Sequence, residues 1–315
     1  GTISADGASA AVLDTRKRVD DLHVHRVTVS EGVFSVGDDV VLQVDMQRRA
    51  AIRANHSATH LVHEALRRRL GDHVTQKGSL VAADRMRFDI SHPKAITPEE
   101  LTQVEDDVNG RVRANSDVVT RLMEPDAAVA VGAMALFGEK YGDEVRVVSM
   151  GDADADKAGG VYSTELCGGT HVRRTGDIGL FKIVSESAVA AGVRRIEVVT
   201  GHAAETHMRA QDQALQVVAS ILKASPDQVG ERVESLVEDR RQLERELQDA
   251  RRQLATGGSS AKPEAKNVGG IAFASKSLDG MPARELKSLA DDMKGQVVSG
   301  VVAVVSNTDG KASLV

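Results

Sequence analysis

The chain has 315 residues, enough for two or three domains that each bury a hydrophobic core. Its formal net charge of −6 excludes binding to nucleic acid through bulk positive charge, so any contact with RNA requires local basic patches. Aromatic residues make up 2% of the chain and tryptophan is absent, which disfavours recognition of single strands by stacked bases.

Residues 1–50 carry short alternating apolar runs that predict strands. Valine and leucine alternate with polar residues over 22–29 and 33–44, and turn residues interrupt the runs at 31–32 and 37–38. Short strands joined by tight turns in this way predict a small antiparallel β-barrel.

A helix is predicted after residue 51, because good helix formers follow and neither Pro nor Gly occurs before Gly71. In such a helix His56 and His60 stand at i and i+4 on one face. Most histidine pairs at this spacing are ordinary surface or packed residues, and a minority bind zinc. A zinc protease would carry Glu where this chain has Ser57, which disfavours peptide hydrolysis. His63, on the same face, is expected to support the pair or to pack.

The remainder of 51–203 alternates strands with helices, which predicts an α+β fold. A helix opens at Thr97-Pro98-Glu99-Glu100, where Thr is the N-cap, Pro takes the first helical position and Glu the third. A second, shorter helix is predicted near 126–134. Strands are predicted at 76–80, 86–90, 118–122, 145–148, 180–185 and 195–200.

Cys167 and His171 repeat the spacing of the histidine pair in a different setting. Gly168 and Gly169 lie between them, which favours a tight loop that folds two ligands back toward one point. Cys167 is the only cysteine of the chain, so it has no disulfide partner within the chain and suits a reducing cytoplasm. With the histidine pair, these residues supply two, three or four ligands of a type that suits zinc.

From 204 to 255 the apolar pattern becomes helical. Ser225-Pro226 separates two helices, and the apolar residues of the second follow alternating spacings of four and three, interrupted at Arg240. This pattern predicts a helical hairpin or a short coiled coil, through which two copies of the chain could form a dimer.

A linker is predicted over 256–270, where Gly, Ser and Pro are frequent. Residues 271–315 then begin a βαβ unit, in which Pro282 opens the helix. The chain has no initiator Met and its last predicted strand stops on an apolar residue, so we expect a fragment of a longer protein in which this last domain is partial.

Several of these segments, in this order, closely resemble the editing domain of the alanyl-tRNA synthetase family. The similar segments are Arg53–Leu61, Gln76–Leu80, Arg87–Asp89, Glu165–Val172 and Ala191–Glu197. The editing domain of threonyl-tRNA synthetase has similar His and Cys/His pairs but typically carries Pro where this chain has Thr170. Free-standing alanyl-editing proteins share the motifs and are the nearest alternative.

The resemblance implies a zinc-containing editing domain at 51–203, preceded by the barrel and followed by the helical region and part of a C-terminal domain that helps to bind tRNA. It implies hydrolysis of Ser-tRNA(Ala) and Gly-tRNA(Ala), since a pocket for alanine cannot exclude glycine and rejects serine only weakly. As a hypothesis, one zinc ion per chain is held by His56, His60, Cys167 and His171. Whether the zinc takes part in catalysis or organises the pocket stays open.

Family position also implies roles for two further residues, and three cations are candidates for contact with tRNA. The Thr59 hydroxyl is expected to meet the serine hydroxyl of the substrate, and Gln76 to position it; we assign both to catalysis. Lys77, Arg194 and Arg195 are the candidates for contact with phosphates at the acceptor end of tRNA, with a solvated surface position as the alternative for Arg194.

Three functions therefore stay open: the editing part of a synthetase, a free-standing editing protein, and a tRNA-binding module with purely structural zinc. The expected partner is tRNA(Ala) mischarged with Ser or Gly. No Gly-rich phosphate loop occurs, so charging of tRNA with ATP is not expected of this chain. No apolar run is long enough to cross a membrane and no leader opens the chain, which predicts a cytoplasmic location. The chain departs from the family at Ser187-Ala188, where a glycine pair is usual.

Overall fold

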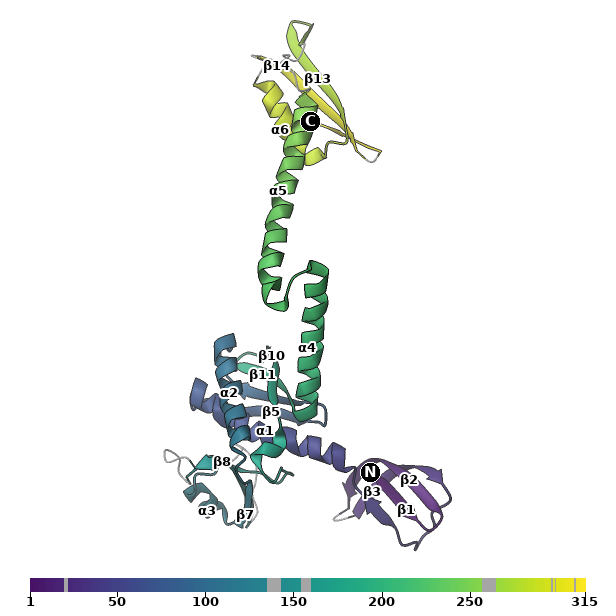
Figure 1. Ribbon diagram of the computed structural model, residues 1–315, viewed down its shortest axis with the longest axis vertical. Coiled ribbons are helices and arrows are strands. Elements are labelled where there is room, and N and C mark those ends of the chain that lie inside the picture. The colour runs from purple at the N-terminus through teal and green to yellow at the C-terminus, as the bar shows by residue number, and fades with distance from the viewer. Residues whose placement is uncertain are drawn as a thin grey trace. The chain divides into compact units, whose positions relative to one another are not determined.

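The computed structural model divides into two compact units, Gly1–Gln213 and Ala214–Val315. Figure 1 shows the helices and strands as ribbons and labels many of them. The structure describes residues 1–19, 22–134, 143–153, 160–256, 265–295, 297, 299–308 and 310–315. The finer division expected from the sequence stays a prediction, with parts at 1–50, 51–203, 204–255, 256–270 and 271–315.

The first unit opens with a four-stranded antiparallel sheet in the order β3-β2-β1-β4. Its strands are β1 (Thr2–Ala5), β2 (Ala8–Arg18), β3 (Leu22–Glu31) and β4 (Val41–Gln43). Among the described residues neither β3 nor β4 pairs with a further strand, so the sheet is open. The predicted small barrel at 1–50 is therefore wrong, because four strands, one of them only three residues long, are too few to close a ring.

Helix α1 (Met46–Leu70) confirms the helix predicted for the histidine pair. The Asp45 side chain caps its start by accepting the Arg48 N–H at 2.9 Å. Its end is at Gly71, whose backbone φ of 115° is a conformation that favours glycine. Between Ala54 and Leu66 all side chains except that of His56 are buried, because the helix is enclosed by a sheet and by other elements of the unit.

The sheet beneath α1 is antiparallel and has the order β10-β11-β6-β5. Its strands were all predicted, and they span β5 (Gln76–Val81), β6 (Met86–Ser91), β10 (Phe181–Ala190) and β11 (Val193–Thr200). Ser187 and Ala188 lie exposed in β10, in register with Arg195 and Arg194 of β11. Ser187-Ala188, where the family usually has a glycine pair, therefore lies on the edge strand of this sheet and not in a loop.

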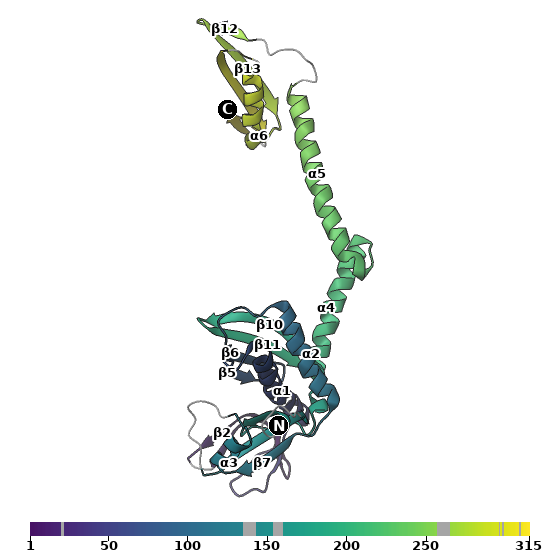
Figure 2. The ribbon, with the colours of Figure 1, turned by 90° about the vertical axis from the view of Figure 1, so that its left-hand side faces the viewer.

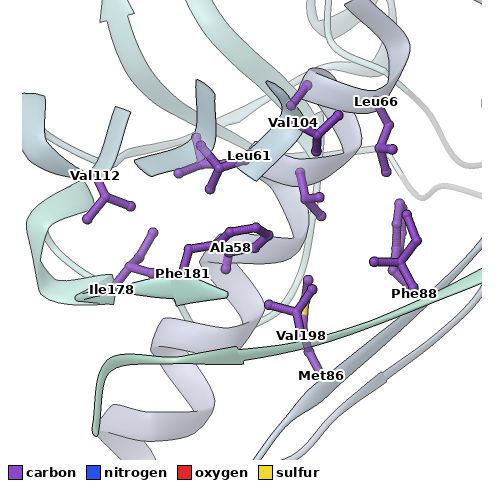
Figure 3. Close-up of a cluster of buried hydrophobic side chains, with 14 of the residues drawn as sticks. Ala58, Leu61, Leu66, Met86, Phe88, Val104, Val112, Ile178, Phe181 and Val198 are labelled. Carbon is purple, nitrogen blue, oxygen red and sulfur yellow. The ribbon is translucent and has the colours of Figure 1, made fainter. Parts of the chain in front are cut away.

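Helix α2 (Pro98–Ala114) also packs on α1 and closes the core of the first unit. The predicted capping box is confirmed: Thr97 Oγ1 accepts the Glu100 N–H at 3.2 Å, and the Glu100 carboxylate accepts the Thr97 N–H at 3.0 Å. Figure 3 shows side chains of α1, α2 and the sheet converging in this core, among them Leu61, Phe88 and Val104. Burying each such side chain contributes about 1.5–3 kcal/mol, so α1 has a rigid support.

A smaller antiparallel sheet in the order β7-β8-β9 completes the first unit. Its elements are β7 (Val119–Met123), α3 (Pro125–Ala130), β8 (Val145–Ala153), β9 (Val161–Leu166) and the 3-10 helix η1 (Thr175–Ile178). Strand β9 was not predicted. It ends one residue before Cys167, so it delivers the Cys/His loop to the side of α1.

The helical region predicted from 204 consists of α4 (Gly201–Leu222), the 3-10 helix η2 (Pro226–Gln228) and α5 (Val229–Thr256). Large apolar side chains on these helices are exposed, including Val218, Ile221, Leu243 and Leu247. The helices are confirmed, whereas their pairing as a hairpin or coiled coil stays a prediction.

The second unit ends in a sheet of order β12-β13-β14-β15. Helix α6 lies against this sheet (Figure 2). Its elements are β12 (Lys266–Val268), β13 (Ile271–Asp279), α6 (Ala283–Lys294), β14 (Gly300–Thr308) and β15 (Lys311–Leu314). Strands β13 and β14 are parallel, which confirms the βαβ unit. Strand β12 lies within the range expected as linker, and 257–264 of that range lie outside the described residues. No helix in the described part of the chain has the length and apolar character needed to span a membrane.

Candidate metal centre

Four potential metal ligands from two distant parts of the chain meet beside α1. His56 and His60 come from the helix, and Cys167 and His171 come from the loop that follows β9. Their ligand atoms all lie within 4.8 Å of one another. The structure therefore brings together the whole ligand set expected from the sequence.

The separations suit a tetrahedral ion. Cys167 Sγ lies 3.2 Å from His171 Nε2 and 3.5 Å from His56 Nε2. A tetrahedral zinc ion with ordinary bond lengths to sulfur and nitrogen would place those ligand atoms about 3.6 Å apart. The other separations are no longer than 4.8 Å, so the ligand atoms would draw closer together when all four bind one ion.

The Nδ1 atoms of the three histidine rings, which point away from the cluster, have contacts that also fit metal binding. Each Nδ1 lies beside an acceptor, which leaves Nε2 of each ring as the ligand atom. The pairs are His56 with the Thr170 carbonyl at 3.3 Å, His60 with Glu165 Oε2 at 2.6 Å, and His171 with Ser57 Oγ at 3.1 Å. Among the described residues, the buried Nε2 of His60 has no hydrogen-bond partner, and a metal ion would satisfy it.

The protonation states of the cluster are strongly coupled. Burial opposes ionisation of the Cys167 thiol, but hydrogen bonds with His171 and His56 and the nearby positive charge of His60 outweigh it and lower the thiol pKa to about 3. Burial likewise disfavours a charged His60, yet the Glu165 and Cys167 anions raise the pKa of His60 to about 10. The same imidazolium, with His63, holds the pKa of Glu165 well below its usual range despite burial. Without a metal, His60 therefore carries a proton that a bound ion would displace.

Two arginines and a glycine fix the Cys/His loop. Arg53 of α1 donates from Nε to Thr170 Oγ1 at 3.0 Å, and Arg146 of β8 donates to the carbonyls of Cys167 and Gly169. Gly169 lies so close to His56 that a Cβ there would be 2.0 Å from the ring carbon Cε1. The loop can approach the helix only because residue 169 has no side chain.

The two residues assigned to catalysis lie outside this cluster. Thr59 is buried, and its hydroxyl donates to the Asn55 carbonyl at 3.0 Å and lies 3.0 Å from Met86 Sδ on β6. Gln76, at the start of β5, has its amide 3.4 Å from Ser79 Oγ. The Thr59 hydroxyl can therefore accept a further hydrogen bond but has already used its proton. The catalytic roles of both residues stay predictions.

Two of the three cations expected to contact phosphates are already paired. Arg194 forms a two-point ion pair with Glu186, and Arg195 forms one with Asp89 at 2.7 and 2.8 Å. Lys77 is exposed on β5. Either arginine would have to exchange its carboxylate for a phosphate, so contact with tRNA stays a prediction for all three.

Reasoning from the sequence missed the residues that support the ligands. Glu165 and Arg146 contact the ligands or their loop, and Ser57 was considered only as the residue that replaces a protease Glu. One signal was available for Glu165: in an extended chain it shares a face with Cys167, two residues on. The contact with Arg146 depends on pairing of β8 with β9, which no local pattern reveals.

Comparisons with known proteins give a consistent result. A family model described as "Threonyl and Alanyl tRNA synthetase second additional domain" matches residues 145–197, which include Cys167 and His171. The chain is 56% identical over 315 residues to an alanine–tRNA ligase of Sphingopyxis alaskensis. It is 55% identical over 311 residues to an alanine–tRNA ligase of Rhizorhabdus wittichii. Each alignment covers 98% of this chain and 35% of the relative, so the chain spans about a third of the length of the curated relatives it matches.

Proposed function

Since this chain is a homologue of a segment of alanine–tRNA ligases, we propose that it is an editing hydrolase that cleaves the ester bond of mischarged tRNA(Ala). The proposed substrates are Ser-tRNA(Ala) and Gly-tRNA(Ala). A pocket for alanine cannot exclude glycine and rejects an added hydroxyl weakly, so a second hydrolytic site has a chemical purpose in this family.

The observation that carries the proposal is the convergence of His56, His60, Cys167 and His171 with an acceptor behind each ring. We propose that these four side chains hold one zinc ion. When bound, the ion would supply positive charge beside the substrate ester. His56 and Cys167 are half-buried and His60 and His171 are buried, so His56 and Cys167 are the ligands nearest to solvent.

Around the cluster, the residues of the chain would bind and orient the substrate. Arg53 and Arg146 place two guanidinium groups on the loop that carries Cys167, where they favour an anionic acceptor end. Thr59 would accept a hydrogen bond from the serine hydroxyl, and Gln76 would position the ester. Lys77, Arg194 and Arg195 would contact phosphates farther from the cluster. Such substrates place the activity in the cytoplasm, where aminoacyl-tRNA is used.

A second candidate is a tRNA-binding module in which zinc only maintains the fold. It is favoured by the ligand set itself, since four protein ligands around one ion are typical of structural zinc sites. The free-standing editing protein gains no support from the two relatives described above, which are ligases that the chain covers to 35%. A homodimer formed through the helical or C-terminal region remains a further proposal.

The test is hydrolysis of Ser-tRNA(Ala), Gly-tRNA(Ala) and Ala-tRNA(Ala) by the zinc-loaded chain. Editing predicts rapid loss of the seryl and glycyl esters while the alanyl ester decays at its uncatalysed rate. Binding of all three tRNAs without loss of any ester would instead support the module with structural zinc.

A further inference from the structure

Glu165 lies behind the metal centre and uses both oxygens of its carboxylate on histidines. Its Oε2 lies 2.6 Å from His60 Nδ1, and its Oε1 lies 2.9 Å from His63 Nδ1. The residue is only 8% exposed, so solvent does not compete for these contacts. A buried carboxylate has no proton to donate when ionised, so both rings must supply the hydrogen.

The backbone of Glu165 is fixed independently of the metal ligands. It lies in β9 opposite Val148 of β8, and it forms an isolated bridge with Met134 on the other side. The Leu166 N–H donates to the Met134 carbonyl at 2.9 Å. The carboxylate is thus held by strand pairing on both sides and can act as a fixed reference for the histidine rings.

We propose that Glu165 is a positioning residue that holds His60 in the tautomer with hydrogen on Nδ1, so that Nε2 faces the other three ligands. This inference rests on the proposed metal site. Of the three acceptors behind the ligand rings, the Thr170 carbonyl and the Ser57 hydroxyl are neutral and only Glu165 is an anion. A charged acceptor makes a stronger hydrogen bond and raises the basicity of the ligand nitrogen.

His63 gives the carboxylate its orientation. Its ring packs edge-on against Phe88 at 5.3 Å between centroids and is buried, so it cannot turn away from Glu165. By binding Oε1, it stops the carboxylate from rotating about its axis and leaves Oε2 for His60. His63 therefore supports a ligand without being one, as its place on the helix predicts.

Replacement of the Glu165 carboxylate by an amide distinguishes positioning of His60 from simple packing. Glu165→Gln keeps the shape, but an amide has one acceptor oxygen where the carboxylate has two. Its NH2 group must then face one of the two histidines and force hydrogen onto Nε2 of that ring. If this ring is His60, the ligand nitrogen is blocked. If it is His63, a buried N–H is left without an acceptor and His60 keeps only a neutral acceptor, so zinc binding weakens in either arrangement.

The test compares zinc dissociation constants of the wild-type chain, Glu165→Gln and Glu105→Gln, measured by competition with a chromogenic chelator. Glu105 is the matched control: both its oxygens are also occupied, by Lys182 Nζ and the Ile183 N–H at 2.9 Å each, but away from the cluster. We expect Glu165→Gln to weaken zinc binding by about 10- to 100-fold and Glu105→Gln to change it less than about threefold. Equal affinities of Glu165→Gln and wild type would overturn the proposal.

A measurement on the wild-type chain keeps the proposal testable if Glu165→Gln does not fold. Nitrogen-15 NMR of the histidine rings in the zinc-loaded protein reports which nitrogen carries hydrogen. Hydrogen on Nδ1 of His60 and of His63 supports the positioning role, and hydrogen on Nε2 of His60 overturns it. The proposed function is judged separately by ester hydrolysis: tight zinc binding with no turnover would refute editing and leave the role of Glu165 intact.

Discussion

Substitution of Gly169 by alanine should damage the metal centre while an identical change one residue earlier should not. The added Cβ at Gly169 would lie 2.0 Å from Cε1 and 2.5 Å from Nδ1 of His56. Ordinary contact begins at 3.4 Å, so the loop or the ring must move by at least 1.4 Å, the difference between 3.4 and 2.0 Å. Either the loop moves and takes the Cys167 sulfur with it, or the half-buried His56 ring turns away, and both movements displace a ligand atom from the cluster.

A metal site tolerates errors of only about 0.2 Å in its bond lengths, so this displacement should weaken zinc binding at least about tenfold, or about 1.4 kcal/mol. Competition with a chelator measures the change, and circular dichroism checks that the fold persists. At Gly168 an added Cβ meets nothing within 4 Å, so Gly168→Ala should bind zinc within about threefold of wild type. If Gly169→Ala binds zinc as tightly as Gly168→Ala, the close approach of loop and helix is not what shapes the site.

Three further predictions concern stability. In the metal-free protein the pKa of Cys167 is about 3, against 9.0 in the unfolded chain, so its contribution to folding stability is lost as pH falls from 9.0 toward 3. The pKa of His60 is about 10, against 6.5 in the unfolded chain, so its contribution is lost as pH rises from 6.5 to 10. Between pH 6.5 and 9.0 the two contributions change with pH in opposite directions and cancel. Melting temperatures of the protein kept metal-free by a chelator should therefore be constant over this range and fall below pH 6.5. A steady rise of the melting temperature from pH 6.5 to 9.0 would contradict this. Leu61→Ala removes a fully buried side chain of α1 and should lower the free energy of unfolding in urea by about 2–5 kcal/mol, whereas a loss below 1 kcal/mol would mean that the core is not packed as described. Thr97→Ala should cost about 1 kcal/mol in the same assay by removing the capping box of α2, and an unchanged midpoint would argue against that cap.

Features governed by local rules were predictable from the sequence. The helix of His56 and His60 follows from an uninterrupted run of helix formers, and its end follows from Gly71. The start of α2 follows from Thr97 and Pro98, which satisfy backbone donors whatever lies elsewhere in the chain. These signals work because they involve neighbours within one turn.

Features that depend on contacts distant in the sequence were not predictable. The alternation in 1–50 correctly indicated strands, but closure of a sheet depends on how many strands pair and where, and no local pattern determines that. Arg195 looked like a free cation for phosphate, yet strand register places it opposite Asp89. The anion behind His60 is likewise supplied by a residue more than a hundred positions away.

We propose above that mischarged tRNA is hydrolysed at the His/Cys cluster. The most direct test is the single-turnover rate of Ser-tRNA(Ala) hydrolysis by the wild-type chain and by Cys167→Ala, with bound zinc quantified in each. We expect rapid hydrolysis by the zinc-loaded wild type and a loss of at least about 100-fold in the variant, matched by loss of the metal. Equal hydrolysis by the two proteins would place the chemistry elsewhere and refute the proposed site.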